Sequence, residues 1–328
     1  MPVAALDPLR FHPIFRHYLW GGHRLRTALR KATGTETCAE SWEVVDHGQD
    51  QSVVSAGPLA GMTLHSLVLQ FGEQLFGQHA PQRSFPLLFK FLDASRDLSV
   101  QVHPDDAYAA RLNPPDLGKT EAWIVLAAEP GSRIYAGLKP GVDRRSFARA
   151  LAKGTVASCL HSFEPTVGDC VFIEAGTMHA LGAGLLVAEI QQSSDTTYRV
   201  FDWNRVDQDG NPRQLHIEEA LEVTDFACGP IGPQVPQPTE DTHRERLVAC
   251  DKFVLDRWQV DDRTELGGDD RFHLLAVLSG SLGIPGDPTG QPLRQGETLL
   301  LPACLGRVAL SPQTPTQFVD IWLPNANC

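Results

Sequence analysis

Short runs of strand-forming residues, each ended by Gly, Pro, Asp or Asn, make up most of this 328-residue sequence. Typical runs read SWEVVDHG, AWIVLAA, GDCVFIEAG, GLLVAEIQQ, HLLAVLSGSLGI and GETLLLPA. Several such runs in one chain, separated by turn-forming residues, are typical of β-sheet proteins. We therefore expect a mainly β fold.

A few segments have the pattern of helices instead. TLHSLVLQFGEQLFG (63–77) spaces its apolar residues as an amphipathic helix does, and DRRSFARALAKG (143–154) has an acidic start and a glycine stop. A third helix is expected over 217–226, IEEALEVTDF. The first two are interpreted as accessory helices that pack against the β scaffold or interrupt it.

A segment rich in proline and glycine divides the chain. CGPIGPQVPQPTEDTH lacks apolar periodicity, which is typical of a linker. We expect an N-terminal domain with helical insertions (1–227), a linker (228–245) and a smaller C-terminal β domain (246–328).

A weak internal repeat extends across this linker. Residues 168–179 read GDCVFIEAGTMH and residues 296–307 read GETLLLPACLGR, so both combine a glycine, an acid, a strand and a small turn. The first copy ends in His179 and the second in Arg307. The repeat predicts two β-barrels of one plan, of which only the first keeps a metal ligand. The alternative is a chance similarity of two hairpins, because turns of this kind favour glycine anyway.

Charge and composition exclude some classes of partner. The formal net charge is −12 and the pI is near 5.4, whereas binding to nucleic acid requires a basic surface. No run approaches the roughly 18 apolar residues of a membrane span, and the N-terminus lacks the pattern of a secretory signal. The seven cysteines are scattered, odd in number and never paired as C-x-x-C. Reduced thiols in the cytoplasm are the expectation.

DLSVQVHPDD (97–106) raises the question of a metal site. In an extended chain Ser99, Gln101 and His103 share one face, while the valines between them face the other. Glu121 in GKTEAW and His179 in EAGTMH lie on or beside other expected strands. Together with Gln101 and His103 they offer nitrogen and oxygen donors that suit Zn²⁺ in an open, catalytic site. Each residue alone is more typical of a hydrogen-bonded or exposed position.

Two cations near these residues indicate the charge of the ligand. Lys119 precedes Glu121 by two residues, and Arg199 lies in the segment EIQQSSDTTYRVFDWNR. Zn²⁺ with Glu121 gives +1, and the two cations raise the sum to +3. A phosphate monoester with nearly two negative charges, next to an enediolate, matches that sum. The alternatives are a solvated turn lysine, and an arginine in a salt bridge to Asp195 or Asp202.

The combined motifs resemble one known family. LDASRDLSVQVHPDD, GKTEAW, GDCVFIEAGTMHALG and EIQQSSDTTYRVFDWNR, with the N-terminal PIFRHYLWGGHRL and AESWEVVDHG, resemble the type I mannose-6-phosphate isomerases. The resemblance runs from residue 11 to the linker and more loosely beyond it. It implies a zinc-dependent enzyme with two cupin-type β-barrels (jelly-rolls), the C-terminal barrel being non-catalytic.

The resemblance also implies roles for individual residues. One Zn²⁺ per chain would be held by Gln101, His103, Glu121 and His179. The substrate-facing polar positions of the family correspond to Lys90, Ser99, Lys119 and Arg199. The sequence departs from the second cupin motif at Glu174, which replaces a proline.

The expected reaction interconverts mannose 6-phosphate and fructose 6-phosphate by proton transfer between C1 and C2 through a cis-enediol(ate). Lys119 and Arg199 are expected to stabilise negative charge, and Lys90 and Ser99 to contact phosphate or sugar oxygens. The general base is left open between Asp195, a histidine next to the metal ligands and Lys119. The partner is a small sugar phosphate, and the chain is expected to be a monomer or a weak homo-oligomer.

Two other functions use the same residues. Two histidines and a carboxylate also form the iron site of non-haem oxygenases. A non-catalytic regulator that binds sugar phosphates on a cupin scaffold is the other alternative. The two cations and the complete ligand set favour the isomerase over both.

Overall fold

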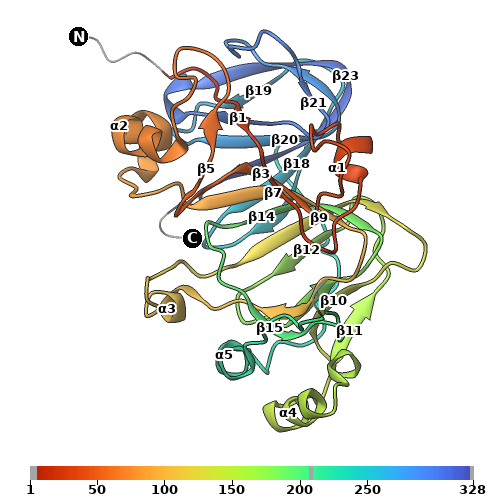
Figure 1. Cartoon of the computed structure of the whole chain (residues 1–328). Helices are drawn as coiled ribbons and strands as arrows, with labels where there is room; N and C mark the ends of the chain where they lie inside the picture. The colour runs from red at the N-terminus through yellow and green to blue at the C-terminus, as the bar shows by residue number, and fades with distance from the viewer. Residues whose placement is uncertain (1–5, 207–209, 326–328) are drawn as a thin grey trace.

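Sheets of five, six and eight antiparallel strands carry most of the chain in the computed structural model, which describes residues 6–206 and 210–325 (Figure 1). Helices are few and short. The expectation of a mainly β protein with a few accessory helices is therefore confirmed.

Two of the sheets lie in the N-terminal two thirds of the chain. The five-stranded sheet has the order β11 (Leu160–Phe163), β10 (Ile134–Leu138), β13 (His179–Leu181), β8 (Val100–Val102) and β15 (Tyr198–Phe201). The six-stranded sheet has the order β12 (Cys170–Ile173), β9 (Glu121–Ala128), β14 (Leu185–Gln192), β7 (Leu87–Ala94), β3 (Glu40–Val44) and β2 (Ile14–Arg16).

These two sheets pack face to face. Trp123, Val171 and Val187 of the six-stranded sheet share one buried cluster with Ile134 and Leu181 of the five-stranded sheet. Such packing places side chains from both sheets in the same interior space.

The eight-stranded sheet is formed by the C-terminal part of the chain (blue in Figure 1). Its main path is β16 (Gln237–Pro238), β17 (Arg244–Ala249), β18 (Val254–Val260), β23 (Arg307–Trp322), β20 (His273–Gly283) and β21 (Leu293–Arg294). β19 (Thr264–Gly267) pairs with β23, and β22 (Thr298–Leu301) pairs with β20. The expected linker over 228–245 thus ends in residues that already pair within this sheet.

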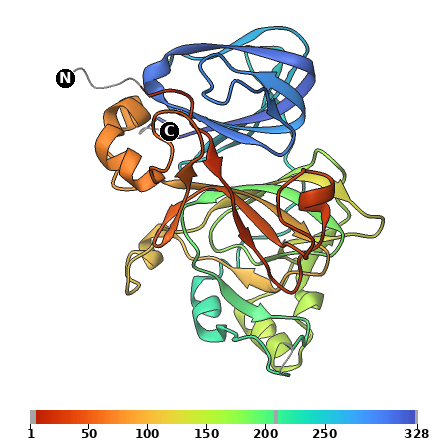
Figure 2. The same cartoon turned by 45° about the horizontal axis from the view of Figure 1, so that its top comes forward.

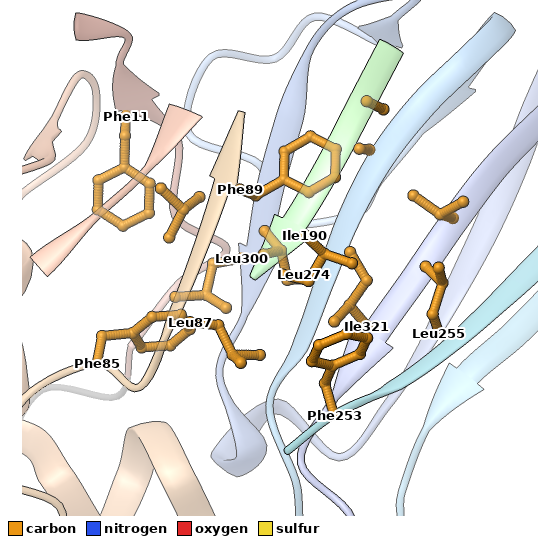
Figure 3. Packing of buried hydrophobic residues seen from close by; sticks show 14 of the residues in the cluster. Phe11, Phe85, Leu87, Phe89, Ile190, Phe253, Leu255, Leu274, Leu300 and Ile321 are labelled. Atoms are coloured by element: carbon orange, nitrogen blue, oxygen red, sulfur yellow. The ribbon is translucent and has the colours of Figure 1, made fainter. Parts of the chain in front are cut away.

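A continuous hydrophobic core joins the C-terminal sheet to the six-stranded sheet. Figure 3 shows Phe89 and Ile190 from the six-stranded sheet beside Leu274 and Ile321 from the C-terminal sheet. The N-terminal segment also bridges the two, because the backbone of Leu9 pairs with that of Leu300. The two parts of the chain are therefore packed into one body.

The three expected helices are present. They are α2 (Leu64–Phe76), α4 (Arg144–Ala152) and α5 (Ile217–Val223). The Thr63 side chain accepts a hydrogen bond from the Ser66 N–H at the start of α2, and Asp143 and Ser146 form a capping box on α4. α4 and α5 lie at the end of the molecule away from the C-terminal sheet, whereas α2 lies next to that sheet (Figures 1 and 2).

The remaining elements are short. They are the helices α1 (Arg24–Thr27) and α3 (Asp106–Ala109), the 3-10 turns Gly77–His79, Val156–Cys159 and Ala303–Leu305, and the strand pairs β1 (Phe11–His12) with β6 (Val53–Val54) and β4 (Asp46–His47) with β5 (Asp50–Gln51). Helices of one turn leave no amphipathic period, and neither α1 nor α3 was expected from the sequence.

The two copies of the internal repeat take the same local form. In the first, β12 is followed by a turn and a new strand that begins at His179. In the second, β22 is followed by a turn and a new strand that begins at Arg307. In both copies the leading glycine has a positive φ, 93° at Gly168 and 80° at Gly296, a region that L side chains rarely adopt. In the described part of the chain, no helix combines the length and the apolar character that crossing a membrane requires.

Candidate functional site

The polar row of DLSVQVHPDD faces the space between the two N-terminal sheets. Val100 and Val102 of β8 are fully buried on the other face, in a cluster with Ala180 and Val200 of the neighbouring strands. Alternation along an extended strand then turns Gln101 in the opposite direction. The strand ends where Pro104 follows His103, since proline has no N–H for a ladder hydrogen bond.

Strand register brings residues from distant parts of the sequence next to Gln101. Gln101 lies opposite His179 of β13 on one side and opposite Arg199 of β15 on the other. Residues directly opposite each other in antiparallel strands have Cβ atoms about 5 Å apart. Glu121, the first residue of β9, approaches the same space from the six-stranded sheet.

Three of the predicted ligands form one compact group. A ligand atom from each of His103, Glu121 and His179 lies within 4.8 Å of the others, and all three side chains are buried. The Nε2 atom of His179 is 3.4 Å from Oε1 of Glu121, and Nε2 of His103 is 3.6 Å from Oε2. Two imidazole nitrogens and a carboxylate converging in this way make a possible metal site.

Backbone carbonyl groups fix how the two imidazole rings are turned. Nδ1 of His103 lies 3.0 Å from the carbonyl oxygen of Thr196, and Nδ1 of His179 lies 2.9 Å from that of Thr177. A carbonyl oxygen only accepts, so Nδ1 of each ring donates its hydrogen, and Nε2 keeps the lone pair that a metal needs. Burial lowers the pKa of His179 to about 4, and burial together with the charge of Lys119 lowers that of His103. Both rings are held in the neutral form.

Glu121 has an ion-pair contact with Lys119 but no hydrogen-bond partner. Both carboxylate oxygens are buried and neither accepts a hydrogen bond. Burial, followed by the negative charge of Glu189, raises the pKa of Glu121 to about 8. A buried carboxylate without hydrogen bonds is costly, and a bound cation would offset that cost. The residues present therefore fit a divalent metal.

Gln101 lies beside this group, but its amide nitrogen, and not its amide oxygen, faces the group. Its Nε2 is 3.3 Å from Nε2 of His179, whereas its Oε1 is 3.4 Å from the hydroxyl of Ser99. Only the amide oxygen can bind a cation. A half-turn of the amide exchanges the two atoms and makes Gln101 a fourth ligand.

A cavity of about 280 Å³ opens above the group. Six predicted site residues line it: Lys90, Ser99, Gln101, Lys119, Asp195 and Arg199. The other lining residues are Tyr18, Trp20, Glu40, Leu92, Leu98, Trp123, Leu181, Glu189, Thr197 and Arg213. His103, Glu121 and His179 do not line the cavity, but two of its lining residues contact this group. Gln101 lies next to His179, and Lys119 lies next to Glu121 and His103.

The two predicted cations differ in their surroundings. Lys119 is buried, and its Nζ lies 3.5 Å from Oε2 of Glu121 and 3.3 Å from Nε2 of His103. It is not the solvated turn lysine of the alternative interpretation. Arg199 forms no ion pair with any residue that the structure describes, and its buried Nε has no hydrogen-bond partner. The alternative salt bridges from Arg199 to Asp195 or Asp202 are not formed.

Lys90 lies between two glutamates. Its Nζ is 3.0 Å from Oε1 of Glu189 and 3.6 Å from Oε2 of Glu40. Burial by itself lowers the pKa of Lys90, but the negative charges of Glu189 and Glu40 outweigh it and raise that pKa. Indole N–H groups donate to one oxygen of each carboxylate, Trp42 to Oε2 of Glu40 and Trp123 to Oε2 of Glu189.

Sequence reasoning missed Glu40, Glu189 and Arg213. Glu189 does leave a signal, because it interrupts the apolar run LLVAEIQQ, a strand whose residues are all buried. Asp195, one of the three candidates for the general base, is an exposed residue on the cavity wall. Its side chain makes no hydrogen bond or ion pair with the residues in 6–206 and 210–325.

Comparison with known proteins adds independent findings. A family model described as phosphomannose isomerase type I, catalytic domain, matches residues 9–121. A probable mannose-6-phosphate isomerase of Bacillus subtilis (strain 168) is 37% identical over 92% of this chain and 96% of its own length. The mannose-6-phosphate isomerase of Streptococcus mutans is 35% identical over 90% of this chain and 92% of its own length.

Solved structures give the same result. The crystal structure of the mannose 6-phosphate isomerase from Bacillus subtilis matches with a TM-score of 0.87 at 29% identity, and covers 96% of this chain and 99% of that one. A putative mannosephosphate isomerase from Archaeoglobus fulgidus has the same fold, with a TM-score of 0.78 at 22% identity over 99% of this chain and 100% of its own.

Proposed function

Because the chain belongs to the type I phosphomannose isomerase family, it is a mannose-6-phosphate isomerase, and we propose that it carries out the aldose–ketose conversion in the 280 Å³ cavity. The observation that supports this site is the convergence of His103, Glu121 and His179 next to Gln101 and Lys119, which line the cavity. The substrate is a sugar phosphate, mannose 6-phosphate in one direction and fructose 6-phosphate in the other.

One Zn²⁺ per chain is the metal that we assign to this group. His103, Glu121 and His179 would hold it, with Gln101 as fourth ligand after the half-turn of its amide. Nitrogen and oxygen donors without thiolates suit a catalytic rather than a structural zinc. When bound, zinc supplies a Lewis acid that polarises the carbonyl and hydroxyl oxygens of the sugar.

The cations of the cavity stabilise negative charge on the substrate. The contact of Lys119 with Glu121 supports a role for this ammonium group in stabilising the enediolate. Arg199, opposite Gln101 in the sheet, brings a guanidinium whose Nε lacks a partner. Lys90 and Ser99 contact the sugar oxygens.

Proton transfer between C1 and C2 requires a base within reach of the sugar. We assign it to Asp195, whose carboxylate lines the cavity and is not engaged by another described residue. The protein's other cavity carboxylates, Glu40 and Glu189, are both close to Lys90.

A coupled assay with mannose 6-phosphate, before and after chelation, tests the proposal. We expect turnover that falls on chelation and returns on addition of zinc. Exchange of the C2 hydrogen with deuterium from heavy water separates an isomerase from a non-catalytic sugar-phosphate regulator. Oxygen uptake would instead identify a non-haem iron oxygenase, an alternative that the curated relatives do not favour. Absence of C2 exchange in zinc-loaded protein would refute the proposed function.

The architecture of the whole chain is part of the proposal. We propose two cupin-type barrels, a catalytic one over 1–227 and a non-catalytic one over 246–328, joined by the segment 228–245. The shared strand–turn–strand form of β12–β13 and β22–β23 supports this division, with Arg307 where the first copy has His179.

The expected cellular setting remains the cytoplasm, with the protein as a monomer or weak homo-oligomer. Six cysteines lie in the described part of the chain and all of them are free thiols, as is usual in a reducing compartment.

A further inference from the structure

A second guanidinium, that of Arg213, stands at the mouth of the cavity. Arg213 lines the 280 Å³ cavity and also an adjacent hollow of about 220 Å³. That hollow is walled by His17, Tyr18, Leu19, Trp20, Asp202, Arg205 and Val206. Arg199 and Gln101 line only the first cavity, so Arg213 lies on its outer side, away from the metal group.

Among residues 6–206 and 210–325, the side chain of Arg213 has one ion-pair contact, and that contact is long. Its Nη1 is 3.9 Å from Oδ1 of Asp202, beyond hydrogen-bond distance. The same carboxylate oxygen is already bound by the guanidinium of Arg205, which also donates to the backbone of Asp97. Since Asp202 is engaged elsewhere and the Arg213 side chain is 36% exposed, its hydrogen-bond donors are available to a ligand.

Arg199 and Arg213 reinforce one another as an anion site. Burial is the main cause that lowers the pKa of Arg199, and the positive charge of Arg213 is the next. The two guanidinium groups are therefore close enough to repel each other. The buried Nε of Arg199 has no partner. The charges of Asp202 and Asp195 offset part of this repulsion, but neither aspartate is hydrogen-bonded to Arg199, and a dianion between the two guanidinium groups would stabilise both.

The part of the cavity wall around Lys90 has the opposite net charge. Lys90 carries one positive charge between Glu40 and Glu189, so this part of the wall is negative by one unit. A phosphate placed there would be repelled by two carboxylates, whereas sugar hydroxyl groups can donate to them. The cavity is therefore polarised, with acceptors for hydroxyl groups on one side and two guanidinium groups on the other.

We propose that Arg213, beside Arg199, binds the phosphate group of the substrate and so makes the cavity selective for phosphorylated sugars. This assignment rests on the proposed function. It places the phosphate at the outer side of the cavity, so that the carbonyl end of the sugar reaches inward to Gln101, Lys119 and the metal group. The planar guanidinium of arginine suits two parallel hydrogen bonds to phosphate oxygens, which a lysine cannot reproduce.

The variant Arg213→Gln tests the assignment in the zinc-loaded full chain. A charge-assisted contact to phosphate accounts for about 10- to 100-fold in affinity. We expect KM for mannose 6-phosphate to rise by that factor with little change in kcat, and inhibition by inorganic phosphate to weaken in parallel. Arg213→Lys should recover part of the loss, because it restores the charge but not the paired donors.

Arg145→Gln is the control. It also removes one positive charge, but Arg145 is exposed on α4 and lines neither the 280 Å³ cavity nor the adjacent hollow. KM should stay near the wild-type value in this variant. An equal rise in KM for both variants would mean that the loss follows the overall charge of the protein, and would overturn the assignment to Arg213.

Direct binding of inorganic phosphate, measured by calorimetry, separates the two proposals. If the wild type does not convert mannose 6-phosphate, the proposed function fails, whatever phosphate does. If the wild type turns over normally and Arg213→Gln binds phosphate and mannose 6-phosphate as tightly as the wild type, only the assignment of Arg213 fails. A thermal unfolding midpoint near that of the wild type shows that the variant is folded.

Discussion

The imidazole of His179 on β13 and the carboxylate of Glu121 on β9 approach to 3.4 Å, although their strands belong to different sheets. The candidate metal site therefore lies where the two N-terminal sheets face each other. A cation bound there would tie the sheets together, so metal binding and stability should be coupled in this protein.

Glu121→Gln tests this coupling. The amide keeps the shape of the side chain but removes the charged ligand. Adding zinc to chelator-treated wild type at a thousand times its dissociation constant should increase the free energy of unfolding by about 4 kcal/mol. The variant should gain little. Metal analysis and thermal unfolding with and without zinc are the measurements.

Glu129→Gln is the control for Glu121→Gln, because Glu129 follows directly after β9 and its side chain is 70% exposed. It should bind zinc like the wild type. Stoichiometric zinc and a full increase in stability in Glu121→Gln would show that the metal site lies elsewhere.

The members of the metal group could be identified from the sequence because local rules place them. Alternation in SVQVH puts Gln101 and His103 on one face, and a glycine turn precedes His179. The register that sets Gln101 opposite both His179 and Arg199 could not be identified in this way. Strand pairing depends on contacts between segments nearly 100 residues apart, and no local pattern encodes it.

Glu40 and Glu189 show a second limit of what can be predicted from the sequence. A glutamate in a strand is usually exposed, so the interruption of an apolar run by Glu189 was the one sign in the sequence, and Glu40 had none. The structure accounts for both through Lys90 and the indole N–H groups of Trp42 and Trp123. Buried charges of this kind are identified only when all the partners are known.

The helices over 63–77, 143–154 and 217–226 were identifiable because each one has its own apolar period or cap.

Lys90→Met should destabilise the protein strongly. Lys90 is 5% exposed, and its removal leaves the carboxylates of Glu40 and Glu189 buried without a cation. Breaking a buried ion pair by removing one partner costs about 3–5 kcal/mol. Urea unfolding of the wild type and the variant measures this loss.

The double variant Lys90→Met with Glu189→Gln is the control for this prediction. It removes one of the unpaired charges, so it should recover part of the stability lost in Lys90→Met. A loss below about 1 kcal/mol in the single variant would mean that Lys90 does not compensate these carboxylates.

Asp195→Asn should affect the reaction and leave stability unchanged. The side chain forms no hydrogen bond or ion pair within the described part of the chain, so the free energy of unfolding should change by less than about 0.5 kcal/mol. Loss of a general base lowers kcat by about 10²–10⁴-fold. Steady-state kinetics and exchange of the C2 hydrogen in heavy water should fall together, with little change in KM.

Unchanged C2 exchange in Asp195→Asn would remove Asp195 from the proton transfer. The base would then be sought among the other groups that line the cavity, Lys119 included. Equal stability of the variant and the wild type is the control that makes either result interpretable.

The C-terminal sheet should give the protein a pH-dependent stability that is independent of the cavity. Nδ1 of His273 lies 2.8 Å from Oδ1 of Asp320, and Nε2 lies 3.1 Å from Oδ1 of Asp269. Burial lowers the pKa of His273, but Asp320 and Asp269 outweigh it and raise that pKa to about 10. The folded protein thus keeps a proton that the unfolded chain releases near pH 6.5.

This stabilisation is complete below pH 6.5 and declines as the pH rises toward 10, because the folded state binds more protons than the unfolded state in that interval. Between about pH 6.5 and 8.5 the wild type should lose about 2 kcal/mol more unfolding free energy than His273→Gln, in which the residue does not titrate. Urea unfolding at the two pH values measures the difference. Equal pH dependence in the two proteins would show that His273 is neutral in the folded state, in which case it donates a hydrogen bond to only one of the two aspartates.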